Sequence, residues 1–370
     1  MNNNGHKNKK VGIITFHRAI NYGAVLQVYA LQEKIKELGA EAVILDYRNN
    51  LLEKKHKKRR LSECKSIKDY IRYFLLYKNY NKKFDKFRSF SDEFLNLSKK
   101  YDNFDELKKD SESYNDFICG SDQVWNHSIT NFDTAYFLDF TKTIAKRNSY
   151  AASFGIKSIP DEYKDKYNEL LKKFNKMSIR EKQGAKIIEE VTQRESEVVL
   201  DPTFLISKND WNKIAYDNLI EDKYILVYAF GGSKHIMSLA EKLSKKTGFK
   251  IVAINNNYKK SSNVEYLKSV GPREWLGLFK NAEYILTNSF HGTAFSINFN
   301  KEFFTEFLPE SHGVNSRLED ILELFNLKHR QILSDNVEIC DTNIDFTQVN
   351  KILGNERKKS VEFLQKIIDE

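Results

Sequence analysis

The 370-residue sequence has few cysteines, few prolines and no long apolar run. Its three cysteines, Cys64, Cys119 and Cys340, are too few and too widely spaced for a disulfide framework or a cysteine-based zinc site. With only 4 Pro and 15 Gly, the chain cannot be collagen-like and does not favour a long disordered linker. No stretch reaches the roughly 18 apolar residues that a membrane-spanning helix needs, and no apolar signal region follows the start. We therefore expect a soluble, cytoplasmic protein.

Aromatic residues are plentiful, and the charge is unevenly distributed. With 26 Phe and 19 Tyr, the chain has ample material for buried cores, and its length favours two domains. The formal net charge is +9, but residues 51–100 alone hold 16 Lys/Arg against 6 Asp/Glu, so the rest of the chain is nearly neutral. No nucleic-acid-binding motif accompanies this segment, so no nucleic-acid partner is expected. The segment is either a solvated basic helix or a peripheral contact with an anionic membrane.

The first half of the chain alternates short apolar runs with amphipathic stretches. Strands are expected over 11–16 and 42–47, and the apolar spacing between them predicts a helix that ends at Gly39. This βαβ unit indicates a parallel sheet with helices on its faces. Further strands are expected at 116–119, 150–154, 177–180 and 198–200, with a helix over 182–191.

A second alternating series follows Pro202. Strands are expected at 224–230, 250–254, 283–287 and 303–305, and helices at 235–247, 272–281 and 292–298. A closing helix over 351–368 is expected to break at Gly354. The pattern predicts two α/β domains, 11–200 with a basic helical insert at about 51–100, and 201–350, followed by the closing helix at 351–370.

Four polar clusters follow predicted strands directly. They occupy residues 17–23, 120–126, 180–182 and 288–292. In open parallel sheets, ligands bind beyond the carboxyl ends of the strands, so each cluster marks a candidate binding position.

The cluster at 288–292 is chemically the most informative, because it lies between a strand and a helix. Free N–H groups and the helix dipole favour an anion there, and Ser289 can donate a hydrogen bond to it. Gly292 allows a close backbone approach, and His291 can bind an anion or transfer a proton. The alternative is that His291 is a turn histidine with a structural role only.

Two arginines are candidate cations for an anionic ligand. Arg180 could offer a planar donor fork to a carboxylate or phosphate. Because Glu181 and Asp201 are near in sequence, a structural ion pair is the alternative. Arg317 is a further candidate cation, or a residue of the helix that follows it.

The cluster at 120–126 suits a sugar. Asp122 can accept bonds from hydroxyls, Gln123 adds an amide, and Trp125 could form a platform for a ring face. The alternative is an Asx-turn with Trp125 in the core. Asn21 and Tyr22 either begin the first helix or contact a ligand at its positive end.

Several common catalytic motifs are missing from the sequence. It has no G-x-G-x-x-G fingerprint, which disfavours nicotinamide and flavin dinucleotides. It also has no P-loop, H-E-x-x-H or G-x-S-x-G motif, which weighs against P-loop ATPases, zincins and serine hydrolases. No metal cluster is evident, so neither a metal nor a cofactor is expected.

Together these segments resemble the polysaccharide pyruvyl transferase family. The similarity extends from about Val11 to Leu327, and its motifs follow one another in the same order as in the family. These motifs are residues 13–17 with 21–27, 120–126, 178–182, 200–203 and 287–293. The resemblance implies two Rossmann-like domains with a cleft between them, as in GT-B glycosyltransferases. It also implies transfer of pyruvate from phosphoenolpyruvate, as co-substrate, to two hydroxyls of a sugar, which forms a ketal.

The resemblance also suggests roles for the candidate residues. The residues that would bind phosphoenolpyruvate on the C-terminal side are Arg180, Ser289, His291, Gly292 and Arg317. His291 would act as phosphate ligand and proton donor. The residues that would bind the sugar on the N-terminal side are His17, Asn21, Tyr22, Asp122, Gln123 and Trp125. Asp122 would act as acceptor ligand or general base. A lipid-linked oligosaccharide is one candidate acceptor, and the basic segment 51–100 could then hold the enzyme at the inner face of the membrane.

The chain departs from the family pattern at one position. Better-characterised members have Arg-Leu-His where this chain has Ser289-Phe290-His291, so binding of the anion must rely on other groups. Two alternative functions remain at this level. One is a GT-B glycosyltransferase that uses a nucleotide sugar, and the other is a non-catalytic carbohydrate-binding homologue.

Overall fold

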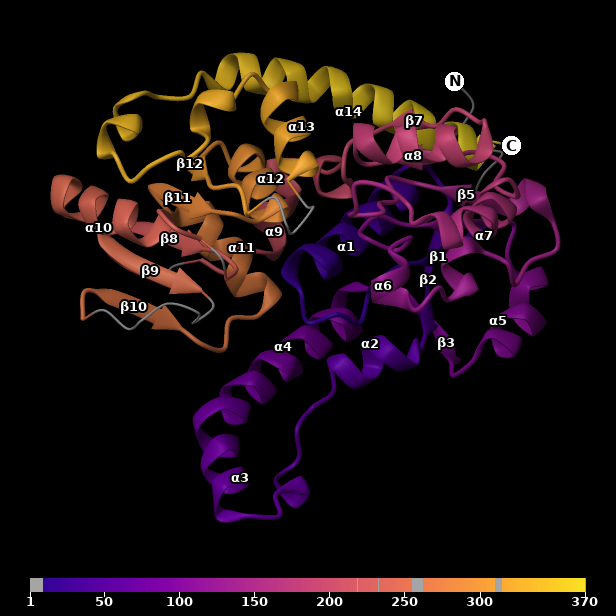
Figure 1. Cartoon of the computed structure of the whole chain (residues 1–370), viewed down its shortest axis with the longest axis horizontal. Helices are drawn as coiled ribbons and strands as arrows, with labels where there is room; N and C mark the ends of the chain where they lie inside the picture. The colour runs from indigo at the N-terminus through magenta and orange to yellow at the C-terminus, as the bar shows by residue number, and fades with distance from the viewer. Residues whose placement is uncertain (1–8, 218, 232, 255–261, 310–314, 370) are drawn as a thin grey trace. The chain divides into compact units, whose positions relative to one another are not determined.

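The structure is a computed structural model that describes residues 9–369, apart from 218, 232, 255–261 and 310–314 (Figure 1). Its contacts divide the chain into two compact units. Unit 1 comprises Met1–His56, Ser91–Ile206 and Leu353–Glu370, and unit 2 comprises Lys57–Phe90 and Ser207–Ile352. In the described part of the chain, no helix is long and apolar enough to cross a membrane.

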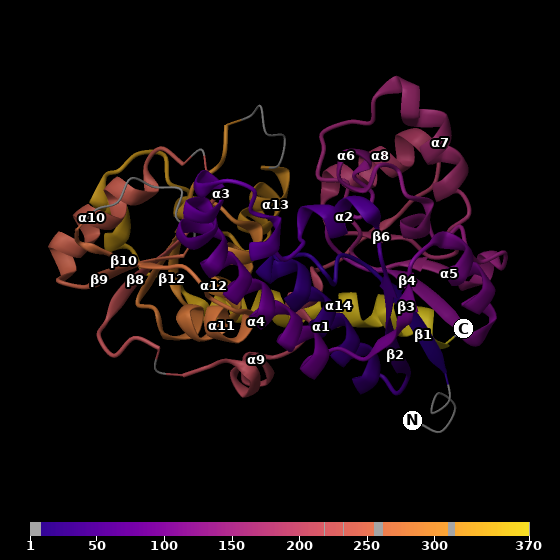
Figure 2. The same cartoon turned by 90° about the horizontal axis from the view of Figure 1, so that it is seen from below.

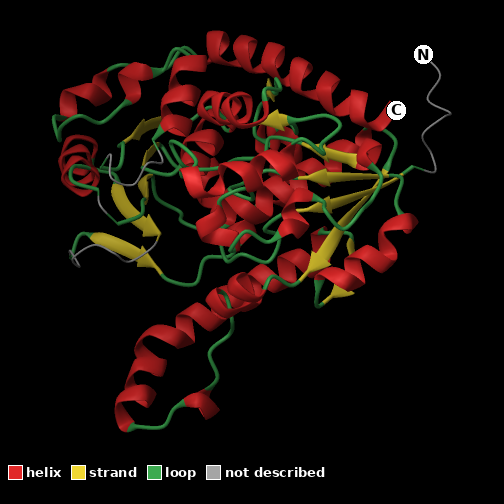
Figure 3. Ribbon diagram, turned by 45° about the vertical axis from the view of Figure 1, so that its right-hand side comes forward, coloured by secondary structure: helices red, strands yellow, loops and turns green. Residues whose placement is uncertain are grey.

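Unit 1 is built on a five-stranded parallel sheet in the order β3-β2-β1-β4-β5. The strands are β1 (Lys10–Ile14), β2 (Glu41–Tyr47), β3 (Leu97–Tyr101), β4 (Asp116–Cys119) and β5 (Arg147–Ser149), drawn as yellow arrows in Figure 3. A small parallel pair, β6 (Ser178–Ile179) and β7 (Glu197–Val198), adds to this unit. Its helices are α1 (Tyr22–Glu37), α2 (Asn50–Lys55), α5 (Phe104–Asp110), α6 (His127–Thr130), α7 (Asp161–Leu171) and α8 (Lys182–Thr192).

The sheet of unit 1 is buried on both faces, because apolar side chains alternate across its strands. Ile13 of β1 joins a core with Leu31 of α1 and Leu364 of α14 (Phe346–Asp369). Cys119 of β4 belongs to the core on the other face, together with Tyr167 of α7. Both faces are therefore covered, as in a doubly wound α/β unit.

Unit 2 repeats this design with the sheet order β10-β9-β8-β11-β12, again all parallel (Figures 1 and 2). Its strands are β8 (Tyr224–Tyr228), β9 (Lys250–Ile254), β10 (Val264–Leu267), β11 (Tyr284–Thr287) and β12 (Glu302–Thr305). Its helices include α9 (Lys208–Ile214), α10 (Ile236–Thr247), α11 (Pro272–Asn281), α12 (Phe290–Asn298) and α13 (Ser316–Leu324). Leu239 of α10 packs with Val227 and Leu286 of the sheet. Aromatic rings cover the other side, where Trp275 packs on Tyr228 and Phe295.

Residues 57–90, which we call the arm, group with unit 2. They contain α3 (Ile67–Arg72), a π-helical stretch (Tyr73–Tyr77) and the start of α4 (Lys78–Phe94). Lys86 of α4 forms an ion pair with Glu274 of α11, and Ser269 donates a hydrogen bond to the Asn79 carbonyl at 3.2 Å. A Cβ on Gly271 would lie 2.8 Å from the Cβ of Lys86, so α4 and the start of α11 are in close contact.

The predicted alternation of strands and helices is confirmed in outline. The helices α5, α7 and α9 were not predicted, and three further differences are local. The strand expected at 150–154 is shifted, since β5 ends at Ser149 and only isolated bridges involve Ala152. β3 and β10 were not predicted, because polar and charged residues interrupt their apolar pattern. The break expected at Gly354 is wrong, because α14 continues through that residue, and a single glycine within a long amphipathic helix costs too little to end it.

Candidate functional site

At the carboxyl end of β1, His17 is held by internal hydrogen bonds. The side chain is buried, with Nε2 3.0 Å from Asp46 Oδ1 and Nδ1 3.2 Å from the Thr15 carbonyl oxygen. Arg48 donates to the other Asp46 oxygen at 2.6 Å. Burial raises the pKa of Asp46, but the hydrogen bonds and charges of His17 and Arg48 outweigh it and lower the pKa to about 2. Both ring nitrogens of His17 therefore face oxygen acceptors within the protein.

Arg180 lies in a cluster of three carboxylates after β6. Its side chain is 1% exposed, and Nη1 lies 2.9 Å from Asp201 Oδ2, while Asp122 and Glu181 each have an oxygen 3.8 Å from the guanidinium. Burial lowers the pKa of Arg180, but the three carboxylates outweigh it and raise the pKa above its ordinary value. One positive charge thus faces three negative charges, which makes the cluster a poor site for an anion. The structure favours the ion-pair interpretation of Arg180 that the sequence left open.

Asp122 is the most exposed carboxylate of this cluster. Its side chain is 14% exposed, against 4% for Glu181 and 0% for Asp201. The residue has a φ of 81°, and its Oδ1 accepts the backbone N–H of Gln123 at 2.9 Å, which closes a tight turn after β4. This turn and Arg180 fix the carboxylate where a hydroxyl could reach it.

The other residues predicted to bind the sugar acceptor lie in different environments. Trp125 is fully buried, donates to the Tyr136 carbonyl at 3.1 Å and packs among aromatic rings, so it belongs to the core. Asn21 is the exposed N-cap of α1, and Tyr22 begins that helix with 1% of its surface exposed. Gln123 lies against Gly155, where an added Cβ would meet the Gln123 amide oxygen at 2.2 Å.

The start of α12 in unit 2 brings Ser289, His291 and Gly292 together. Ser289 is the N-cap, and its hydroxyl accepts the Gly292 N–H at 3.3 Å. Gly292 is required by packing, since a Cβ would lie 2.3 Å from Thr287 Oγ1 at the end of β11. His291 is 8% exposed in the first helical turn. The positive end of a buried helix, a hydroxyl and an imidazole therefore meet at one strand end, which is a suitable environment for a small anion.

A second helix start in unit 2 is already occupied by a carboxylate. Glu306 follows β12, and its oxygens accept the backbone N–H groups of Lys234 at 2.8 Å and of Ile236 at 3.2 Å. The Ser233 hydroxyl donates to the same carboxylate at 2.6 Å. The positive end of α10 is thus neutralised from within the protein. The candidate cation Arg317 lies at the start of a different helix, α13, where it is half-buried.

Sequence reasoning missed Asp46, Glu306 and a polar cavity in unit 1. The cavity measures about 330 Å³ and lies at the ends of β2 and β3, where Tyr47, Arg48, Asp102, Asn131 and Asp133 contribute to its lining. The signal for Asp46 was present, because a lone carboxylate near the end of an apolar strand requires a partner. Within the described ranges, no three His, Cys, Asp or Glu side chains are grouped to hold a metal ion.

A family model described as polysaccharide pyruvyl transferase matches residues 21–305. A search of curated proteins found no match. Among solved structures, the chain is similar to UDP-N-acetylglucosamine 2-epimerase from Rickettsia bellii, with 10% identity, a TM-score of 0.53 and coverage of 98% of both chains.

A second similar structure is the UDP-GlcNAc 2-epimerase of Methanocaldococcus jannaschii, with 14% identity and a TM-score of 0.51, covering 98% of this chain and 99% of the epimerase. The enzyme from Neisseria meningitidis has 12% identity and a TM-score of 0.50, with coverage of 97% and 100%. At this identity the similarity concerns the fold alone. It confirms the predicted fold class, two Rossmann-like α/β domains of the GT-B type.

Proposed function

The chain belongs to the polysaccharide pyruvyl transferase family, and on this premise we propose that it transfers pyruvate from phosphoenolpyruvate to two hydroxyls of a sugar. The product is a cyclic ketal on a polysaccharide or on its lipid-linked precursor. The observation that carries the proposal is the start of α12, where Ser289 and buried His291 lie at the positive end of a helix. A compact ligand with two anionic groups, such as phosphoenolpyruvate, suits such a site, because N–H donors and the helix dipole stabilise its charge.

The reaction requires one proton and two hydroxyl additions. In the proposed sequence, His291 protonates the methylene carbon, and the first sugar hydroxyl adds to the central carbon of phosphoenolpyruvate. The carbon–oxygen bond to phosphate then breaks, phosphate leaves, and the second hydroxyl closes the ketal. Of the two hydroxyl protons, one restores the proton on His291 and the other protonates the departing phosphate.

Asp122 is our candidate for the acceptor residue in unit 1. A carboxylate that accepts a hydroxyl proton must be held in place, and Arg180 at 3.8 Å helps to hold Asp122. In this proposal Arg180 positions Asp122 and does not bind phosphoenolpyruvate itself. Residue 289 is a serine here and not the arginine of better-characterised members. The positive end of α12, His291 and Arg317 are therefore the groups that would hold the donor.

Occupation of the α10 N-terminus weighs against a nucleotide-sugar donor. The structural relatives include epimerases described as bound to UDP-GlcNAc, so a nucleotide is the natural competitor. Phosphate groups of nucleotides favour helix N-termini. Here Glu306 fills the end of α10 with its own negative charge, which would repel a pyrophosphate.

Titration calorimetry with phosphoenolpyruvate and with uridine diphosphate tests the donor assignment. We expect saturable binding of phosphoenolpyruvate, and His291→Gln should weaken it at least about tenfold because a hydrogen bond to the charged ligand is lost. His329→Gln, a change of an exposed histidine elsewhere in unit 2, serves as matched control and should bind as the wild type does. Binding of uridine diphosphate without phosphoenolpyruvate would favour a glycosyltransferase, and binding of neither would favour a non-catalytic homologue.

A further inference from the structure

The arm, residues 57–90, presents a stripe of exposed apolar side chains. Ile67, Tyr70, Ile71 and Phe74 have exposed fractions of 80%, 44%, 54% and 56%. Their spacing of three and four residues places them on one face of the helical stretch that begins at Ile67. Large apolar residues rarely gather in this way on a surface unless something covers them.

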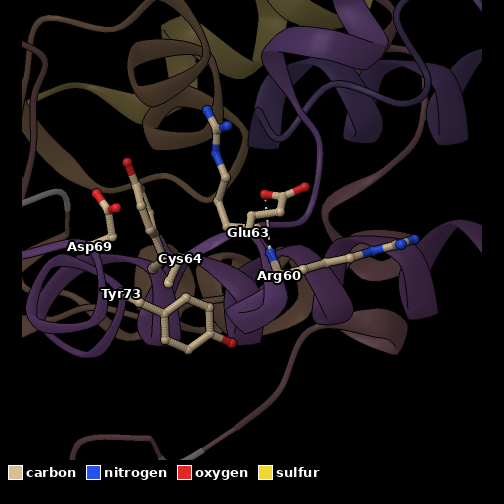
Figure 4. Close-up of a pocket in the computed structure, with 7 residues that line it drawn as sticks. Arg60, Glu63, Cys64, Asp69 and Tyr73 are labelled. Atoms are coloured by element: carbon tan, nitrogen blue, oxygen red, sulfur yellow. Dashed lines mark hydrogen bonds between the residues drawn. The ribbon is translucent and has the colours of Figure 1, made fainter. Parts of the chain in front are cut away.

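Another face of the same helical stretch is already packed within the arm. Tyr73 and Tyr77 line a small cavity of about 160 Å³ together with residues of the 59–64 segment (Figure 4). Asn81 fixes this segment, because it accepts the Arg59 N–H at 3.0 Å and donates to the Arg59 carbonyl at 2.7 Å. The arm is therefore folded on itself with the apolar stripe on its outside.

The charge of the arm identifies what kind of surface could cover the stripe. The arm contains twelve Lys/Arg and three Asp/Glu, so it accounts for the whole net charge of the chain. The acids are all engaged: Glu63 pairs with Lys57, Asp85 pairs with Lys58, and Asp69 closes the capping box of α3. Exposed basic residues flank the stripe in sequence, namely Arg60, Lys65, Lys68 and Lys78.

We propose that the arm docks the protein on an anionic lipid surface. The stripe would enter the interface between headgroups and acyl chains, and the basic side chains would contact the anionic headgroups. A second copy of the chain is disfavoured as the occupant, because two arms would bring like charges together. This inference goes beyond the proposed function, since docking requires neither phosphoenolpyruvate nor a sugar.

Co-sedimentation with vesicles tests the proposal on the full-length protein. We expect binding to vesicles of phosphatidylcholine with phosphatidylglycerol, weak binding to pure phosphatidylcholine, and a loss of binding as salt is raised. Ile67→Glu combined with Ile71→Glu should reduce binding at least about tenfold, because it removes the apolar insertion and adds repulsion. Leu333→Glu is the matched control, since Leu333 is 76% exposed in unit 2 outside the arm, and it should bind normally.

A second pair of changes keeps the test independent of folding. Lys65→Glu with Lys68→Glu leaves the stripe in place and should weaken binding to anionic vesicles only. Circular dichroism is expected to show native helix content in both double variants, because all four residues are exposed. The proposal is overturned if anionic vesicles are not bound, if the stripe variant binds as the wild type does, or if neutral vesicles bind equally. It is also overturned if the stripe variant abolishes a dimer in gel filtration while vesicle binding is absent.

Discussion

At the scale of single residues, the most consequential contact is the ion pair of Arg180 with Asp201. The guanidinium is almost fully buried and lies within 4 Å of three carboxylates. A buried charge that loses its partner is strongly destabilising, whereas an exposed cation is not. Arg180 is therefore expected to matter for stability as well as for any role in the reaction.

Replacement of Arg180 by Met should lower the free energy of unfolding by about 3–5 kcal/mol, because the carboxylates are left buried without their cation. Urea denaturation followed by circular dichroism measures this change. Arg60→Met removes an exposed arginine and should change the free energy by less than about 0.5 kcal/mol. If Arg180→Met unfolds at the same urea concentration as the wild type, Arg180 does not have this structural role.

Asp46 should make stability depend on acid pH. Its pKa is about 2, below the ordinary value of 3.8 that it has in an unfolded chain, so its contribution is complete above about pH 4 and is lost as the pH falls towards 2. Asp46→Asn should therefore lower the free energy of unfolding by about 1–2 kcal/mol at pH 7. Denaturation at pH 7 and at pH 3 should show the difference between variant and wild type narrowing, and a constant difference would contradict the assignment.

The residue types of this network and one of its ion pairs could be inferred from the sequence, but the full set of contacts could not. Arg180, Glu181 and Asp201 were recognised as an alternative ion pair, whereas the additional contact with Asp122 depends on a turn with positive φ. For Trp125, the sequence leaves two interpretations open. An aromatic residue beside polar ones suits a sugar platform or a core position equally well, and only the packing against Phe137 and Phe174 separates the two.

At the scale of elements, two glycines in helices of the second half, Gly292 and Gly354, have opposite surroundings. Gly292 lies in the first turn of α12 in close contact with Thr287, whereas the Cβ of a residue at 354 would have no neighbour within 4 Å. Helix propensity alone makes both of them helix-weakening residues. Their difference lies in tertiary packing, which local propensity does not contain.

These two glycines form a matched pair of tests. Gly292→Ala should lower the free energy of unfolding by about 1–3 kcal/mol, because α12 must move away from β11, and should weaken phosphoenolpyruvate binding. Gly354→Ala should raise the free energy of unfolding by about 0.5–1 kcal/mol, since it removes backbone freedom from the unfolded chain. Thermal unfolding of both variants measures the effects, and a stabilised Gly292→Ala would be inconsistent with the close contact.

The pattern of apolar and polar residues explains which strands could be predicted from the sequence. Strands such as β1, β8 and β9 are buried on both faces and therefore appear as continuous apolar runs. β3 and β10 lie at the edges of their sheets, and their exposed positions carry polar residues. Their apolar signal is too short to separate them from loops by periodicity.

At the scale of the whole molecule, unit 1 is assembled from three separate segments of the chain. The last of them contributes Phe363, Leu364 and Ile367 to the core beneath β1. Unit 2 likewise combines the arm with residues 207–352. The sequence predicts two α/β domains from alternation, but the return of the C-terminal helix to unit 1 rests on contacts between distant segments that periodicity does not encode.

The proposed reaction can be followed directly in a single assay. The protein is incubated with phosphoenolpyruvate and a panel of methyl hexosides or extracted polysaccharide, and both released phosphate and the mass of the sugar are followed. We predict equal amounts of phosphate and of a sugar that has gained one pyruvyl ketal, with His291→Gln reducing the rate by about a hundredfold or more. Consumption of a uridine-diphosphate sugar with no consumption of phosphoenolpyruvate would contradict the proposed reaction.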